Sequence, residues 1–183
     1  MTCTLAPITE FPVFAPAWDA INLLHYGNPL LESRFTSNAL EHLGNGKEMI
    51  AVFGDPKDPD GLAVLAASKL GTWSTFQASQ SPLGAMIMKP GIDVSALGRA
   101  LFGKMAQTCQ IFSITQQDPD ILPRPIEQPT LATLDYIDTA KITVDRDFEH
   151  YWASRGKNLR HNMKRQRNRL EREGVSIRLE MLN

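Results

Sequence analysis

The sequence predicts a layered α/β or α+β domain followed by a long basic helix. Apolar residues recur at helical spacing in separate parts of the first 107 residues, and short apolar runs bounded by turn residues lie between and after them. Eight of the nineteen Lys and Arg residues then fall at 155–172, near the end of the sequence. Helical and strand segments in this order are typical of helices packed on a sheet.

The composition fits one domain with an appended helix. A chain of 183 residues can bury a core, and its 43% hydrophobic and 21% charged residues are ordinary for a globular protein. No stretch approaches the ~18 consecutive apolar residues of a membrane span. The first residues also lack a basic region followed by an apolar run, so no secretory signal is predicted. We therefore expect a soluble, cytoplasmic protein.

Two helices are expected before the first strand. The first is predicted to start at Pro16, because proline fits the first turn of a helix, and to end near Gly27. The second is predicted to run from Thr36, as a cap, to Gly44. One face of the first helix carries apolar side chains at helical spacing: Trp18, Ile21 and Leu24.

Strands dominate the middle of the chain. The apolar runs 49–53 and 62–67 are joined by GDPKDPDG, whose Pro, Asp and Gly residues favour turns, so they predict a hairpin. Further strands are predicted at 73–78, 85–88 and 109–115.

A helix is predicted at 93–107, between the last two of these strands. Its apolar residues recur at helical spacing: Val94, Leu97, Leu101, Phe102 and Met105. Residues 116–130 contain four prolines, which exclude a long regular element. Residues 131–144 are predicted to supply one or two more strands.

The basic segment predicts an amphipathic helix that ends at Gly174. Gly156 leaves two alternatives open, one long helix or a short helix to Ser154 followed by a longer one from Lys157. Apolar residues are spaced along one side of this segment: Phe148, Trp152, Leu159, Met163 and Leu170. Residues 175–181 alternate as a strand does, and we expect another domain or chain to supply the partner strand.

The cations of this helix are candidate anion-binding residues. Residues 1–154 carry 10 Lys or Arg against 17 Asp or Glu, whereas 155–173 carry 8 against 2. The predicted site for phosphate, a phosphorylated glycan or the acidic part of the chain consists of Arg160, Lys164, Arg165 and Arg167. The alternative is a solvated helix in which Glu171 and Glu173 pair with Arg167 and Arg169.

Other reactive residues predict little chemistry. The two cysteines, Cys3 and Cys109, have no metal-binding spacing and are expected to be reduced. The four histidines also lack such spacing, so no metal is predicted: His25, His42, His150 and His161.

Three stretches of the C-terminal part carry a resemblance to known proteins. They are Tyr151 with Trp152, NLRHNMKR at 158–165, and RLEREGV at 169–175. Together with the order of elements, they resemble the CelD-type branch of the GNAT acetyltransferase superfamily and are similar to the Fem-type aminoacyltransferases. The resemblance implies a mixed, mainly antiparallel sheet flanked by helices. It also implies that 1–146 form an N-terminal GNAT-like domain, 147–173 a linker helix, and 174–183 a strand leading into a C-terminal GNAT domain.

The resemblance also implies an acyl-CoA donor, acetyl-CoA or another, for the full-length protein. In such domains an R/Q-x-x-G-x-G/A loop at a helix N-terminus holds the donor pyrophosphate. The candidate here is 93–98, which leaves only Gly98 and Arg99 as possible cofactor contacts, because Asp93 and Ala96 replace the basic or amide residue and the first glycine. An aspartate repels a pyrophosphate, so no cofactor is predicted for this chain alone.

The resemblance implies an N-acyltransferase, in which an amine attacks a thioester and backbone donors hold the oxyanion. The catalytic residues are unknown and expected in the C-terminal domain, with an amino sugar or cell-envelope precursor as acceptor. Tyr136 and Tyr151 are candidate acids for a leaving thiolate, although packing beside Trp152 explains Tyr151 better. The alternative is a nucleic-acid-binding module that uses 155–172; the acidic remainder and the lack of interleaved aromatic residues argue against it.

Overall fold

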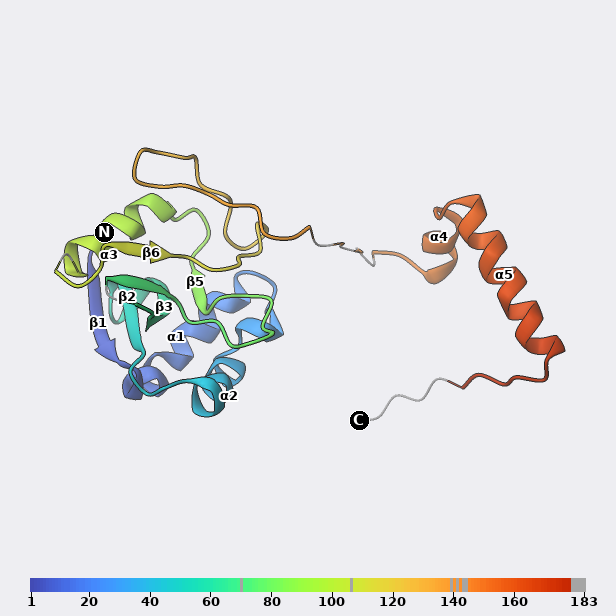
Figure 1. The fold of residues 1–183 in the computed structure, drawn as a ribbon, viewed down its shortest axis with the longest axis horizontal. Helices are drawn as coiled ribbons and strands as arrows, with labels where there is room; N and C mark the ends of the chain where they lie inside the picture. The colour runs from blue at the N-terminus through green and yellow to red at the C-terminus, as the bar shows by residue number, and fades with distance from the viewer. Residues whose placement is uncertain (70, 106, 139, 141, 143–144, 179–183) are drawn as a thin grey trace. The chain divides into compact units, whose positions relative to one another are not determined.

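The computed structural model describes residues 1–183 apart from 70, 106, 139, 141, 143–144 and 179–183. The chain divides into two compact units, which we call the sheet unit (Met1–Tyr136) and the helical unit (Ile137–Asn183) (Figure 1).

The sheet unit is built on one mixed sheet. Neighbouring strands follow the order β1 (Cys3–Pro7), β2 (Met49–Asp55), β3 (Asp58–Ala67), β4 (Thr72–Thr75) and β6 (Ile111–Ser113), and β5 (Met86–Met88) also pairs with β3. Every pair is antiparallel except β4 with β6, which is parallel. The predicted class, a mainly antiparallel sheet flanked by helices, is confirmed.

Both faces of the sheet are covered, which explains the continuous apolar runs in its central strands. Alternate residues of β2 and β3 point to opposite faces, so Ile50 and Leu62 lie in one core cluster and Ala51 and Ala63 in the other. Helices α1 (Phe11–Leu23) and α2 (Ser33–Leu43) contribute to the first cluster, and α3 (Val94–Met105) contributes to the second. Two short 3-10 helices, Ile8–Glu10 and Pro29–Leu31, flank α1.

The strands β4 and β5 lie end to end alongside β3. Both run antiparallel to β3, and they meet at Val64, whose carbonyl accepts from Phe76 and whose amide donates to the carbonyl of Ala85. The amide of Ala85 also donates to the carbonyl of Phe76. Residues 77–84 therefore form a loop between two segments that pair with the same strand. The runs predicted at 73–78 and 85–88 are thus parts of one interrupted strand.

The first helix starts earlier than predicted. It begins at Phe11 with Pro12 in its first turn, and Pro16 lies inside it. The ring of Phe11 packs edge to face on Trp18 with centroids 5.4 Å apart, and both side chains are buried. We attribute the longer helix to this burial, which offsets the backbone hydrogen bond that Pro16 cannot donate.

The second helix starts at Ser33, not at the predicted Thr36. Asp19 of α1 accepts hydrogen bonds from the Ser33 amide (2.7 Å) and hydroxyl (2.6 Å). The first turn of α2 is therefore stabilised by another helix, and Thr36 is buried one turn later. The predicted end is correct, since the amide of Gly44 closes the helix on the carbonyl of Leu40.

Two further differences concern strands. The strand β1, which was not predicted, pairs with β2 in a register that places Leu5 opposite Ala51. The strands predicted at 131–144 are absent among the residues described there, apart from one isolated bridge between Gln128 and Leu131. Arg124 donates hydrogen bonds to the Thr133 hydroxyl and the Asp135 carboxylate, and Glu127 accepts from the amide and hydroxyl of Thr133, so side-chain bonds shape this segment instead. Residues 139, 141 and 143–144 of that prediction lie outside the described residues.

The described residues of the helical unit form two helices, α4 (Phe148–Ala153) and α5 (Lys157–Arg172). Gly156 separates them with an extended backbone, φ −55° and ψ 141°, so the alternative of two helices is correct and that of one long helix is wrong. Gly174 follows α5 at φ 70°, a conformation that favours glycine. The strand predicted at 175–181 is not formed at 175–178, and the rest of it lies outside the described residues.

Candidate functional site

The predicted anion-binding residues Arg160, Lys164, Arg165 and Arg167 all lie on α5 and are exposed. One of them already has an acidic partner. The Nε of Arg167 lies 3.3 Å from the carboxylate of Glu171, and a second pair joins Arg169 to Glu173 at 2.7 Å. These are the two pairs of the solvated-helix alternative, and exposed pairs of this kind stabilise a helix by only about 0.3–0.5 kcal/mol.

The other three predicted residues keep their charges available. Within the described part of the chain, Arg160, Lys164 and Arg165 have no carboxylate within ion-pair distance. Lys164 is one helical turn beyond Arg160, so these two share a face, whereas Arg165 projects to another side of α5. The helix thus presents unpaired cations on more than one side.

Apolar side chains form a second feature of α5. Leu159 and Met163 are 49% and 53% exposed, and Leu170 is half-buried. Their spacing of four and seven residues places them in one narrow line, which we call the apolar stripe. No described residue of α5 is buried, so the stripe makes no core of its own.

Aromatic residues of α4 pair within the helix. The rings of Phe148 and Trp152 stack with centroids 5.8 Å apart, and Phe148 is still 65% exposed. The guanidinium of Arg155 lies over the ring of Tyr151, 4.5 Å from its centroid. This cation–π contact holds Tyr151 beside a fixed positive charge. It adds a partner that the sequence-based packing explanation of Tyr151 did not include.

The predicted donor loop lies mostly inside α3. Asp93 immediately precedes the helix, and its carboxylate accepts from the amides of Ser95 (2.9 Å) and Ala96 (3.2 Å). The bond from the Ser95 amide, with smaller contributions from Ala96 and Arg99, holds the pKa of Asp93 below its usual value. The carboxylate therefore takes the amides that an anionic ligand would need at this end of α3.

The two possible cofactor contacts have other surroundings. Gly98 lies within α3, in the turn after Asp93, and an added Cβ there would meet no atom within 4 Å. Arg99 points its guanidinium to the Asp93 carboxylate at 3.6 Å. Gln128 donates a hydrogen bond of 3.3 Å to the Ser95 hydroxyl, so the segment after β6 also contacts the first turn of α3. These contacts occupy the start of α3 with groups of the chain itself.

The carboxyl ends of the parallel strands are a second place where a ligand could bind, as it does in open α/β sheets. There the hydroxyls of Thr75 and Thr115 lie 2.7 Å apart, and the Thr115 amide donates to Thr75 at 2.9 Å. The side-chain amide of Gln77 donates a hydrogen bond to the side-chain oxygen of Gln116. The backbone carbonyl of Gln116 accepts from the backbone amide of Gly84 at 3.0 Å. Side chains from segments about 40 residues apart thus join the chain beyond the carboxyl ends of these two strands. The sequence contains no local pattern that reveals these contacts.

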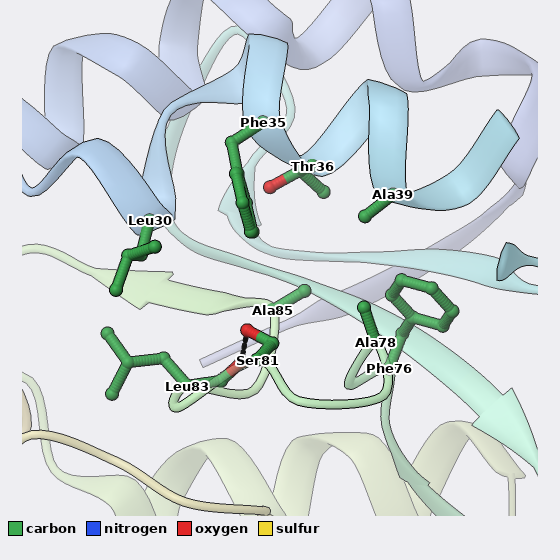
Figure 2. Close-up of a pocket in the computed structure, with 9 residues that line it drawn as sticks. All are labelled: Leu30, Phe35, Thr36, Ala39, Phe76, Ala78, Ser81, Leu83 and Ala85. Carbon is green, nitrogen blue, oxygen red and sulfur yellow. Dashed lines mark hydrogen bonds between the residues drawn. The ribbon is translucent and has the colours of Figure 1, made fainter. Parts of the chain in front are cut away.

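A small surface hollow, with a cavity volume of only about 10 Å³, lies between α2 and the residues around the interrupted strand (Figure 2). Figure 2 shows the Thr36 hydroxyl near Phe35, and the Ser81 hydroxyl bonded to the carbonyl of Leu83. All of its lining residues are uncharged: Leu30, Phe35, Thr36, Ala39, Phe76, Ala78, Ser81, Leu83 and Ala85. The hollow therefore offers no charge to bind a pyrophosphate.

The remaining candidate residues are dispersed. Tyr136 is 77% exposed. Burial raises the pKa of the Cys3 thiol to about 11, although Lys104 opposes this, and burial also raises that of Cys109. His25 contacts the carbonyl of Met88 through Nε2 at 2.6 Å. Among the described residues, no group of three His, Cys, Asp or Glu side chains is placed to hold a metal ion.

Comparisons with known proteins find two similar solved structures. One is a probable acetyltransferase, 11% identical over 76% of this chain and 100% of the other, with a TM-score of 0.40. The second is a GNAT family acetyltransferase from Staphylococcus aureus subsp. aureus USA300_TCH1516, 8% identical over 77% of this chain and 100% of the other, with a TM-score of 0.41. No family model and no curated protein matches the sequence. At this identity and similarity the two structures do not assign the chain to a family.

Proposed function

We propose that this chain is the N-terminal, donor-site-degenerate domain of a GNAT-type N-acyltransferase. The acceptor is an amine such as an amino sugar or a cell-envelope precursor. The resemblance of 151–175 to the CelD-type and Fem-type proteins supports the family, and the mainly antiparallel sheet flanked by helices agrees with the fold that it implies. The catalytic residues then belong to a second GNAT domain.

The observation that carries the degenerate donor site is the position of Asp93. Its carboxylate accepts from two amides at the start of α3, where oriented N–H groups favour an anion. A donor pyrophosphate would have to displace this charge and also meet its repulsion. The residues present do not fit acyl-CoA, so this chain supplies no step of the transfer by itself.

The cations of α5 have a separate role in this proposal. Arg160, Lys164 and Arg165 remain unpaired within the described residues, and guanidinium and ammonium groups recognise phosphate and carboxylate. We assign these residues to the charged part of the acceptor or to bracing the second domain.

Calorimetric titration of the 183-residue chain with acetyl-CoA and with CoA tests the donor-site part of the proposal. We expect no binding heat from either compound. A micromolar dissociation constant for acetyl-CoA would show that the chain has a working donor site. The intact mass of the native gene product tests the second domain, since the proposal requires a polypeptide much heavier than this chain.

A further inference from the structure

The apolar stripe and the unpaired cations of α5 lie on the same helix. At 3.6 residues per turn, Leu159, Met163 and Leu170 fall within one narrow band along the helix. Arg160 and Arg167 border this band on one side, and the remaining basic residues continue around the helix from there. The arrangement is that of an amphipathic helix with a basic polar face.

Such a helix is too polar to cross a membrane and suits a position within its surface layer. No described helix is long and apolar enough to form a membrane span. An interfacial helix buries a narrow apolar face at the boundary between headgroups and acyl chains, while Lys and Arg stay at the level of the lipid phosphates. Trp152, on which the exposed ring of Phe148 stacks, is of the aromatic type enriched at that level.

A nucleic acid or a protein partner would match either the unpaired cations or the apolar stripe, but not both. A nucleic acid would neutralise Arg160, Lys164 and Arg165 but leave the stripe of Leu159 and Met163 in water. A protein surface would bury the stripe but would need its own carboxylates for the cations. An anionic phospholipid surface satisfies both, through apolar contact and through charge complementarity with residues that have no acidic partner in the described part of the chain.

We propose that α5 binds the surface of anionic phospholipid membranes, with the apolar stripe inserted and the unpaired cations on the lipid phosphates. This inference gives the same cations a partner other than the acceptor or second domain named under the proposed function, and it does not depend on the rest of that proposal.

The test is flotation of the full chain with vesicles of phosphatidylcholine alone or of phosphatidylcholine mixed with phosphatidylglycerol. We expect binding to the mixed vesicles that weakens as salt rises, and little binding to the neutral vesicles. The triple variant R160A/K164A/R165A should lose about a hundredfold in partitioning, since each cation near such a surface contributes about fivefold.

The stripe is tested by a matched pair of substitutions. Met163→Glu places a negative charge in the stripe, and Asn168→Glu places the same charge on the other side of α5. We expect Met163→Glu to weaken vesicle binding about tenfold more than Asn168→Glu, because only the first must bury its charge. Circular dichroism of both variants confirms that the helix is retained.

Three results would overturn the proposal. They are absence of binding to the mixed vesicles, equal binding to neutral and mixed vesicles, and equal losses for the two glutamate variants. If the chain instead shifts RNA or DNA in a gel with a steep salt dependence and ignores vesicles, the helix is a nucleic-acid site and the membrane proposal fails. None of these results depends on acetyl-CoA binding, so the two proposals are tested separately.

Discussion

The sheet unit and the helical unit use their side chains in opposite ways. Both core clusters lie in the sheet unit, where Trp18, Leu62 and Leu101 are fully buried. In the helical unit, no described residue is buried. The sheet unit is therefore stabilised by packing, whereas α5 depends on its C-terminal cap at Gly174 and on pairs between neighbouring turns.

The same contrast extends to polar groups. In the sheet unit, Asp93 caps its own helix, and the hydroxyl pair of Thr75 and Thr115 joins the end of β4 to the segment after β6. Every buried side-chain nitrogen or oxygen of the described residues has a hydrogen-bond partner. On α5, Arg160 and Lys164 have no acidic partner within the described residues. Groups available for binding are thus concentrated in the unit that contributes no core.

The largest expected effect tests the packing of the sheet unit. Trp18 is fully buried, and its Nε1 donates to the carbonyl of Leu31 at 2.6 Å. Trp18→Ala should lower the free energy of unfolding by about 3–5 kcal/mol, because it leaves a cavity and an unpaired carbonyl. Denaturant unfolding followed by circular dichroism measures this loss. Val13→Ala, at a 72% exposed position of the same helix, should change it by less than about 0.5 kcal/mol. Comparable losses for both variants would contradict the core assignment.

An intermediate effect is expected where Gly84 packs against Thr115, beyond the ends of the paired strands β4 and β6. A Cβ at Gly84 would lie 2.4 Å from the hydroxyl oxygen and 2.6 Å from the carbonyl oxygen of Thr115. Gly84→Ala should therefore cost about 1–3 kcal/mol of unfolding free energy. Gly103→Ala is the matched control, because that glycine is exposed within α3 and has open space, so alanine should stabilise by about 0.5–1 kcal/mol. If both substitutions changed the free energy of unfolding in the same direction, the close packing of Gly84 against Thr115 would be refuted.

The smallest expected effect tests the local stabilisation of α5. Arg169→Ala removes the pair with Glu173 and should destabilise α5 by about 0.3–0.5 kcal/mol relative to Arg165→Ala, which removes no pair. Both changes alter helix propensity equally, and their difference reports the pair together with the smaller interaction of Arg169 with the helix dipole in the last turn. Helix content by circular dichroism at low and high salt is the measurement. A difference that persists at high salt would mean that the residue acts through packing and not through charge.

Local sequence was sufficient where neighbouring residues decide the structure. The hairpin of β2 and β3 follows from its Pro- and Asp-rich turn, and α3 follows from its apolar spacing. At Gly156 the sequence left two alternatives open, and the structure has the break, because an exposed helix gains little from spanning a glycine. The pairs of Arg167 and Arg169 with glutamates were among the predicted alternatives, since residues four apart meet on any helix.

Tertiary contacts decided the remaining features. The start of α2 depends on Asp19 of another helix, the early start of α1 on the burial of Phe11, and β1 on the free edge of β2. The closure at Thr75 and Thr115 likewise joins residues about 40 positions apart.

The sequence by itself determined the layered class and the concentration of cations on α5, and it gave the break at Gly156 as one of two alternatives. Only the tertiary structure showed that Asp93 and Thr75 are engaged within the sheet unit while the cations Arg160 and Lys164 stay unpaired among the described residues. The physical reason is the separation along the chain of the residues that decide each property. Helix periodicity, glycine conformation and charge are properties of nearby residues, whereas the satisfaction of a carboxylate or hydroxyl depends on which distant groups the packed core brings within hydrogen-bond distance.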